Sequence, residues 1–394
     1  MLQLAQDRPN FGNGGEVDNM IESAKAERQK RLLLGPPLDL SHTVALKPED
    51  FDTNFNRMIS RDKSCRELFR DVIGCEDIIQ RFESYQLIVE GMRKHGADPR
   101  SQIPFTFVFK DPPGTGKTTT ARKVGQIFYD MGFLSKPSVV ECSVTDMVGE
   151  YTGQTRPKVI NLLEMALGKV LFIDEAYRLG KGDLQKDATN ELVDCITKTR
   201  YAGKMIIILA GYEEDMNQLI QVNRGLASRF PTEIIFRYMS PEHCLSLLKQ
   251  RLGEFDILIK GLDNKIPSEM GSLMIYQLFA DLAATPAWGN GRDVETLAKS
   301  LIGYGFMASV RNGPKDGVLS ISFKELHAFM KSMLEERKKR GSKRRGFSRF
   351  QEFSQMKPSQ SIKAPPPPTL DCSPAMEAEP VESKYKLDHG FHEV

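Results

Sequence analysis

Short apolar runs alternate with amphipathic stretches through the middle of this chain. The runs are each four to six residues long and lie at 105–109, 139–142, 170–173, 205–210 and 233–236. Mostly apolar runs of this length are typical of strands that are buried on both faces. We therefore predict an α/β fold with a five-stranded parallel sheet whose two faces are covered by helices.

Apolar residues at helical spacing fill the segments around these runs. The helices that this spacing predicts lie at 65–95, 117–131, 159–166, 187–199 and 214–220. Gly74 interrupts the first of them. From Pro241 onward the strand pattern stops, and leucine-rich helical patterns predict a small, wholly helical domain after the sheet.

The chemistry of the chain centres on residues 105–120, FTFVFKDPPGTGKTTT, where the first apolar run ends in a loop rich in proline and glycine. Gly114 and Gly116 allow backbone N–H groups to close around a phosphate, and Lys117 can reach the β and γ phosphates. The Thr118 hydroxyl can ligate Mg²⁺. The helix that opens at Lys117 adds its positive end to the same anion site. This segment predicts a strand, a phosphate loop and a helix.

An acidic pair follows the third apolar run. Four apolar residues at 170–173 precede Asp174 and Glu175, which places both carboxylates at the end of the strand where open α/β sheets bind ligands. In this position Asp174 can bind the Mg²⁺ shell and Glu175 can polarise an attacking water. The pair together with a phosphate loop is typical of a hydrolase whose nucleophile is water.

Composition and charge argue against a disulfide-rich, a zinc-binding or a membrane-spanning protein. Because 54 basic residues nearly balance 52 acidic ones, the total charge does not point to nucleic acid or to an anionic membrane. Six cysteines without a CxxC pair or a histidine cluster argue against a zinc site or a disulfide framework. The chain shows neither a signal pattern nor an apolar stretch long enough to span a bilayer. We expect an intracellular protein, cytoplasmic or nuclear, without membrane contact.

One short segment occurs twice. Residues 11–20, FGNGGEVDNM, resemble residues 288–297, WGNGRDVETL, in an aromatic residue, Gly-Asn-Gly, an acidic residue, valine and a closing apolar residue. We interpret the first copy as the end of a preceding module. Chance similarity between two Gly-Asn turns that precede helices is the alternative.

The C-terminal segment differs in composition from the rest. Residues 337–345, RKKRGSKRR, are strongly basic, and seven of the chain's 22 prolines follow them. This composition predicts a disordered tail. The basic run fits a nuclear-import signal, a nucleic-acid patch or a solvated helix end.

Six motifs occur in order along the chain: GTGKTTTARKV, SVTDMVGEYTGQTRPKV, VLFIDEAYRLG, IIILAGYEEDM, NRGLASRF and WGNGRDVETL. In this order they resemble the AAA+ ATPases and, within them, the CbxX branch, which includes the red-type Rubisco activases and the stage V sporulation protein K group. The resemblance covers residues 60 to 335, approximately. It implies a P-loop NTPase domain with a helical lid, ATP and Mg²⁺ as ligands, a homo-oligomeric ring, expected to be a hexamer, and a protein substrate.

The resemblance also implies roles for individual residues. Arg229 would be an arginine finger that reaches a neighbouring subunit's site, and Arg292 would be a sensor arginine that contacts phosphate within its own subunit. Ile73 would contact adenine, and Tyr151 would be the aromatic residue of the central pore. The full expected sets are Lys117, Glu175, Arg229 and Arg292 for catalysis, Ile73, Pro113, Gly114, Thr115, Gly116, Lys117, Thr118 and Thr119 for the nucleotide, and Thr118 and Asp174 for the metal.

These observations predict the domain organisation. The expected segments are 1–34 as the remnant of a preceding lid, 35–60 as a linker, 61–240 as the nucleotide-binding domain, 241–336 as the helical lid and 337–394 as the tail.

The predicted function is ATP hydrolysis coupled to remodelling of a protein, and two alternatives remain open. Asp111 stands where the pattern GxxxxGK[ST] has its first glycine, so the chain could be a nucleotide-binding scaffold that hydrolyses poorly. The basic run at 337–345 alone supports the second alternative, a nucleic-acid remodeller. Tyr212 is a further departure, because many AAA+ proteins have a sensor asparagine there.

Overall fold

The computed structural model describes residues 12, 14–34, 45–52, 65–110, 112–151, 153–261, 269–285, 288–312 and 319–354. Asp111 and residues 355–394, which include most of the proline-rich segment, lie outside this range. The chain divides into two units, Met1–Ser342 and Lys343–Val394. The nucleotide site predicted from the sequence belongs to the first unit.

Five parallel strands form the central sheet in the order β2-β3-β4-β1-β5. The strands are β1 (Thr106–Lys110), β2 (Val139–Ser143), β3 (Val170–Asp174), β4 (Ile206–Gly211) and β5 (Thr232–Ile235). Each predicted run coincides with its strand to within one residue at either end. The prediction of a five-stranded parallel sheet is confirmed.

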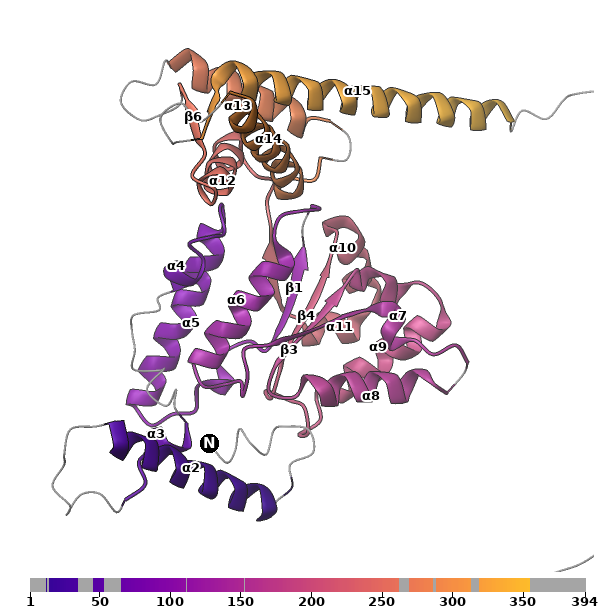
Figure 1. The fold of residues 1–394 in the computed structure, drawn as a ribbon. Coiled ribbons are helices and arrows are strands. Elements are labelled where there is room, and N and C mark those ends of the chain that lie inside the picture. The colour runs from indigo at the N-terminus through magenta and orange to yellow at the C-terminus, as the bar shows by residue number, and fades with distance from the viewer. Residues whose placement is uncertain are drawn as a thin grey trace, which may run out of the picture. The chain divides into compact units, whose positions relative to one another are not determined.

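Helices cover both faces of this sheet (Figure 1). The helical elements of this domain are α4 (Cys65–Leu68), α5 (Glu76–Lys94), η3 (Pro99–Ser101), α6 (Lys117–Asp130), α7 (Val144–Met147), α8 (Thr155–Ala166), η4 (Ala176–Gly180), α9 (Asp183–Cys195), α10 (Glu213–Val222) and α11 (Arg224–Arg229). Phe107 and Phe109 of β1 pack with α5 and α6, whereas Val108 packs in the core formed with α8 and α9. Alternate side chains of one strand thus enter two cores, because successive residues of a strand point to opposite faces.

The lid has a hydrophobic core of its own. Its helices are α12 (Pro241–Gly253), α13 (Glu269–Ala283), α14 (Gly291–Asn312) and α15 (Phe323–Ser354). Two further strands, β6 (Leu258–Lys260) and β7 (Ser320–Ser322), pair in parallel within the lid. The expectation that strands end at Pro241 was therefore wrong, since a strand of three residues is too short to show a period of two.

The N-terminal helices are joined by an ion pair. Arg31 of α2 (Gly14–Leu34) donates from Nε and Nη2 to the two carboxylate oxygens of Asp50 in α3 (Pro48–Phe51), at 2.8 and 2.7 Å. The hydrogen bonds from Arg31 hold the pKa of the Asp50 carboxyl below its usual value. The segment at 35–60, expected to be a linker, thus contains a short helix bonded to α2.

Helix α15 extends farther than the sequence led us to expect. It continues to Ser354, through the basic run that we expected to open a disordered tail. Lysine and arginine are strong helix formers, so a basic run can prolong a helix. No helix in the described part of the chain combines the length and the apolar composition needed to cross a bilayer.

Candidate functional site

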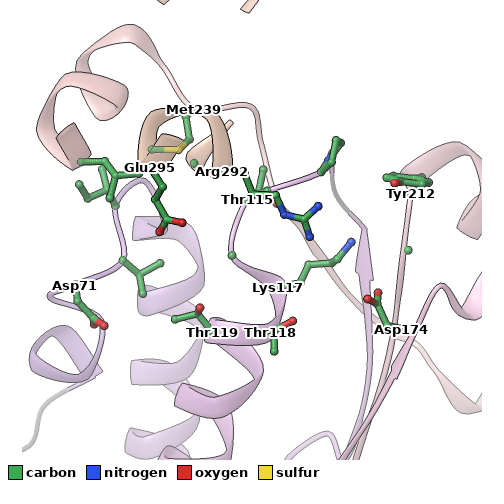
Figure 2. A pocket seen from close by; sticks show the side chains of 18 of the residues that line it. Asp71, Thr115, Lys117, Thr118, Thr119, Asp174, Tyr212, Met239, Arg292 and Glu295 are labelled. Carbon is green, nitrogen blue, oxygen red and sulfur yellow. The ribbon is translucent and has the colours of Figure 1, made fainter. Parts of the chain in front are cut away.

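A cleft of about 390 Å³ lies where β1, β3 and β4 end, and the lid contributes part of its lining. Its size is within the range of small-molecule sites, ~300 to 1,000 Å³. The structure brings together in this cleft most of the residues predicted for the nucleotide, the metal and catalysis: Ile73, Pro113, Gly114, Thr115, Gly116, Lys117, Thr118, Thr119, Asp174, Glu175 and Arg292. Many of them are visible in Figure 2.

The phosphate loop owes its shape to two glycines. Gly114 and Gly116 have φ angles of +77° and +92°, in the left-handed region that side chains disfavour. Thr115 closes the turn through a hydrogen bond from Oγ1 to the carbonyl oxygen of Pro112, at 3.1 Å. Gly116 then caps α6, whose first N–H groups have no partners within the helix. Such a helix start favours an anion.

The side chain of Lys117 extends across the cleft toward Tyr212 (Figure 2). Its ammonium nitrogen lies 5.6 Å from the centre of the Tyr212 ring, within the range of a cation–π contact. Tyr212 in turn stacks against Tyr177, with ring centres 6.0 Å apart. Tyr212 therefore provides an aromatic surface beside Lys117 at the position where many AAA+ proteins have a sensor asparagine.

Asp174 and Thr118 offer a carboxylate and a hydroxyl to the same cleft. Magnesium prefers oxygen ligands and keeps several of its waters, so a site with few protein ligands and open space fits this ion. One Asp174 oxygen also accepts a hydrogen bond from the backbone N–H of Glu175, at 2.9 Å. That contact fixes the turn at which β3 ends.

Glu175 has an unusual backbone and two side-chain partners. Its φ angle is +50°, a strained value for a residue other than glycine, and such strain concentrates at functional sites. Its carboxylate lies 2.8 Å from Arg178 Nη2 and accepts a longer hydrogen bond, 3.3 Å, from the Tyr177 hydroxyl. The side chain of Glu175 remains 41% exposed, so these partners hold the carboxylate without burying it.

Arg229 and Tyr151, in contrast, do not line the cleft. Arg229 ends α11, where Nη1 contacts the Ser228 hydroxyl at 3.1 Å and the Gly225 carbonyl oxygen at 3.3 Å. Its buried Nε has no hydrogen-bond partner among the described residues. Tyr151 is 69% exposed and lies between α7 and α8. Because both residues lie outside the cleft, the arginine-finger role of Arg229 and the pore role of Tyr151 stay predictions.

Several residues of the cleft were not predicted from the sequence. Those among them that contribute side chains include Asp71, Tyr177, Met239, Leu247, Arg251 and Glu295. Arg251 of α12 pairs with Glu295 of α14 at 3.1 Å, and its closer partner Glu254 is the main cause of the raised pKa of Arg251. Glu295 lies one helical turn beyond Arg292, so helical spacing could have identified it. Met239 and Leu247 had no sequence signal that separates a ligand contact from ordinary core.

The acidic neighbours of Arg292 pair elsewhere. Asp293 forms an ion pair with Arg337 of α15, and Glu295 forms one with Arg251. The sequence alone also allowed Arg292 to serve as a simple ion-pair partner of Asp293 or Glu295, and the structure pairs both carboxylates with other arginines. Arg292 lines the cleft at the first turn of α14, on the lid side of the phosphate loop (Figure 2).

Comparisons with known proteins match parts of this chain to two family models. A family model described as "ATPase family associated with various cellular activities (AAA)" matches residues 107–238, and a model of an AAA lid domain matches residues 1–61. The second match includes α2 and α3.

Individual relatives cover larger parts of the chain. Stage V sporulation protein K of Bacillus subtilis (strain 168) is 30% identical over 249 residues, which are 62% of this chain and 73% of that protein. The chloroplastic ribulose bisphosphate carboxylase/oxygenase activase of Cyanidioschyzon merolae is 33% identical over 216 residues, 54% of this chain and 72% of the relative. The ESX-1 secretion system protein EccA1 of Mycolicibacterium smegmatis (strain ATCC 700084 / mc(2)155) is 32% identical over 318 residues, but this chain spans only 55% of its length.

Proposed function

Since this chain belongs to the AAA+ ATPases of the CbxX branch, we propose that it hydrolyses ATP with Mg²⁺ in the described cleft and assembles into a homo-oligomeric ring that remodels a protein. One observation supports this proposal most directly. The phosphate loop, the acidic pair after β3 and Arg292 of the lid all line one cleft.

Binding of ATP would use the phosphate loop and the lid together. The N–H groups of the loop and the start of α6 bind the phosphates, while Lys117 and Arg292 neutralise their charge. Ile73, Met239 and Leu247 supply an apolar surface suited to the adenine ring. Mg²⁺, when held by Thr118 and Asp174, supplies positive charge beside the phosphate oxygens.

Hydrolysis would depend on Glu175. Its carboxylate accepts a hydrogen bond from a water molecule and so increases the nucleophilicity of that water toward the γ-phosphate. In the described structure this carboxylate is bonded to Arg178 and Tyr177. Because the carboxylate stays partly exposed and has further lone pairs, it can accept a hydrogen bond from water beside these contacts or in place of one of them.

The ring proposal accounts for the position of Arg229. A guanidinium that lies outside its own cleft and ends a short helix can enter the cleft of a neighbouring subunit. There it would stabilise the charge that develops on the γ-phosphate, a role that suits a planar and permanently charged group. A hexamer is the assembly that we propose.

A protein substrate is supported by the relatives and by Tyr151. One relative is named an activase of ribulose bisphosphate carboxylase/oxygenase, and another is named a protein of the ESX-1 secretion system. We propose that exposed Tyr151 contacts a substrate polypeptide in the pore of the ring. We also propose that residues 1–34 form part of a lid like that of a second AAA+ module, in agreement with the lid match at 1–61.

The experiment that tests the proposal measures assembly and hydrolysis in one sample. Purified protein is mixed with ATP and Mg²⁺, and its mass and its release of phosphate are followed together. A ring that releases phosphate supports the proposal, with Lys117→Ala as the inactive control. A ring that binds ATP without turnover favours the scaffold, and Asp111→Gly then tests whether Asp111 limits ATP binding.

A further inference from the structure

The lid turn at 288–291 interlocks with the phosphate loop. The Asn290 side chain donates from Nδ2 to the carbonyl oxygen of Pro113 at 3.0 Å, and the Gly291 N–H donates to the carbonyl oxygen of Gly114 at 3.0 Å. A Cβ atom at Gly114 would lie only 1.9 Å from the carbonyl oxygen of Gly289. The two turns thus touch at a point where only glycine fits.

Asn290 has features that few other residues could supply. It is fully buried, and its φ angle of +47° lies in the left-handed region, where asparagine is enriched among residues other than glycine. Its Oδ1 accepts a hydrogen bond from the Met239 N–H at 3.1 Å, while its Nδ2 donates to Pro113. An aspartate could not make both bonds when ionised, because it has no donor.

The bonds from the lid determine where the loop amides point. In a trans peptide the carbonyl oxygen and the following N–H point in opposite directions. Because the Pro113 carbonyl oxygen is bonded to Asn290, the N–H of Gly114 points away from the lid turn. The hydrogen bond from the Gly291 N–H to the Gly114 carbonyl oxygen likewise makes the N–H of Thr115 point away from the lid turn. Both amides belong to the loop that cradles phosphate.

A second set of contacts holds the lid turn itself. One oxygen of Asp293 accepts the N–H of Gly289 at 2.5 Å, and the other forms an ion pair with Arg337. The side chains of Asp293 and Arg337 are only 15% and 16% exposed. The guanidinium carbon of Arg337 lies 5.4 Å from the centre of the Trp288 ring. Arg337, the first residue of the basic run, therefore supports the lid turn from α15.

We propose that Asn290 is a positioning residue for ATP, which orients the first amides of the phosphate loop from the lid, and that Asp293 and Arg337 hold Asn290 in place. The inference rests on the proposed function, since it concerns how the same cleft binds phosphate. Asn290 acts through Pro113 and Gly114. The lid thereby contributes to the phosphate site in two ways. Its turn orients the amides of the loop, and Arg292, the residue that follows this turn, supplies a positive charge.

The test separates the phosphates from the base. Affinities for ATP and for adenosine are measured by calorimetry on the full chain and on Asn290→Gly, which tolerates the backbone angle but lacks the side chain. Loss of an oriented hydrogen-bonding group weakens ATP binding by about tenfold, whereas adenosine binding stays unchanged. Arg337→Gln also weakens the binding of ATP and not that of adenosine, but by a smaller factor than Asn290→Gly does. Tyr304→Phe, which removes a bond from Tyr304 to Glu325 elsewhere in the lid, is the matched control and changes neither affinity.

Three results would overturn the inference. If binding of both ligands weakens by the same factor, Asn290 only maintains the lid, because Leu247 of the lid and Met239, which is bonded to Asn290, also line the cleft. If neither affinity changes in a folded Asn290→Gly protein, the bond to Pro113 is irrelevant to binding. If Asn290→Gly does not fold, the affinities of Arg337→Gln provide the test. Equal weakening of ATP and adenosine binding in Arg337→Gln would then refute the inference. Failure of the wild-type protein to bind ATP would instead reject the proposed function.

Discussion

The carboxylate of Glu175, the N-cap residue of η4, lies 2.8 Å from the guanidinium of Arg178 within that short helix. Both side chains are partly exposed, with 41% and 49% of their surfaces accessible. The residue proposed to activate water is thus paired with a cation in this structure. Exposed ion pairs of this kind are weak and exchange readily with water.

Removal of Arg178 is expected to increase basal ATP hydrolysis. In Arg178→Ala the Glu175 carboxylate loses its charged partner and becomes available to water, and because the pair is weak the increase should be no more than several-fold. Phosphate release under saturating ATP measures the effect, with Arg178→Lys as the charge-retaining control. A fall in turnover with unchanged ATP affinity would show that Arg178 takes part in catalysis.

Replacement of Glu175 by glutamine is expected to separate binding from hydrolysis. Glu175→Gln keeps the shape of the side chain but loses the base, so turnover should drop by about 10² to 10⁴, while the dissociation constant for ATP stays within about twofold. Single-turnover phosphate release and an ATP titration provide the two numbers. Turnover near the wild-type rate would eliminate Glu175 as the residue that polarises water.

Arg229 is expected to act on a neighbouring subunit. Arg229→Ala and Lys117→Ala proteins should each be nearly inactive alone, but a mixture should regain activity at interfaces where an intact Arg229 meets an intact phosphate loop. Activity is measured across a series of mixing ratios. The matched control is Arg237→Ala, which removes an exposed arginine paired only weakly with Asp77, at 3.7 Å, and should hydrolyse normally. Absence of rescue at every ratio would contradict a shared site.

Tyr151 is expected to matter only when a polypeptide is present. Tyr151→Ala should keep basal ATP hydrolysis and lose the stimulation that an unfolded probe protein, casein, gives to the wild-type protein, because the aromatic ring supplies the contact area. Tyr151→Phe keeps the ring and should retain the stimulation. Equal losses of basal and stimulated activity in Tyr151→Ala would indicate a packing role.

Buried thiols are expected to make the fold sensitive to alkaline pH. Burial raises the pKa values of Cys65, Cys75, Cys142 and Cys244 from 9.0 to about 12. Near and above pH 9 the unfolded chain releases these protons and the native chain keeps them, so the stability that depends on the protonated thiols is fully present well below pH 9 and is lost as the pH rises toward 12. Each thiol lowers the free energy of unfolding by at most about 1.4 kcal/mol per pH unit, a slope reached only where the thiol is ionised in the unfolded chain and protonated in the native one.

Urea unfolding at several pH values tests the thiol prediction. Between about pH 9 and 10 the unfolding free energy of Cys142→Ala should fall less steeply with pH than that of the wild-type protein. The two slopes should differ by the contribution of a single ionising thiol. Below about pH 8 the two slopes should coincide, because thiols remain protonated in both states. Identical slopes above pH 9 would show that the Cys142 proton is lost as easily in the folded chain as in the unfolded one.

The sequence predicted the sheet well because its strands carry a strong local signal. Runs such as 170–173 are buried on both faces, and every position in them is apolar. The phosphate loop and the acidic pair could be predicted to meet, since both follow parallel strands and all carboxyl ends of such strands lie at one edge. Strands β6 and β7 were missed because three residues are too few to show a pattern.

The contacts between lid and loop could not be predicted in the same way. Asn290 and Pro113 are separated by 177 positions, and nothing local to either residue indicates the other. The repeated Gly-Asn-Gly did draw attention to this segment, and both copies begin a helix at their second glycine, Gly14 and Gly291. Periodicity indicates which side chains are buried, but not which buried amide meets which carbonyl group.

The span of the cleft along the chain has a consequence for protein synthesis. Its lining begins at Asp71 and ends at Glu295, and the turn that touches the phosphate loop is supported by Arg337. Domains fold from the N-terminus as they emerge from the ribosome. The sheet can therefore form while the lid is still being translated. At that stage the nascent chain carries a phosphate loop without its contacts from the lid turn. A ribosome stalled before α15 would therefore hold a folded sheet and a lid turn that lacks its support from Arg337.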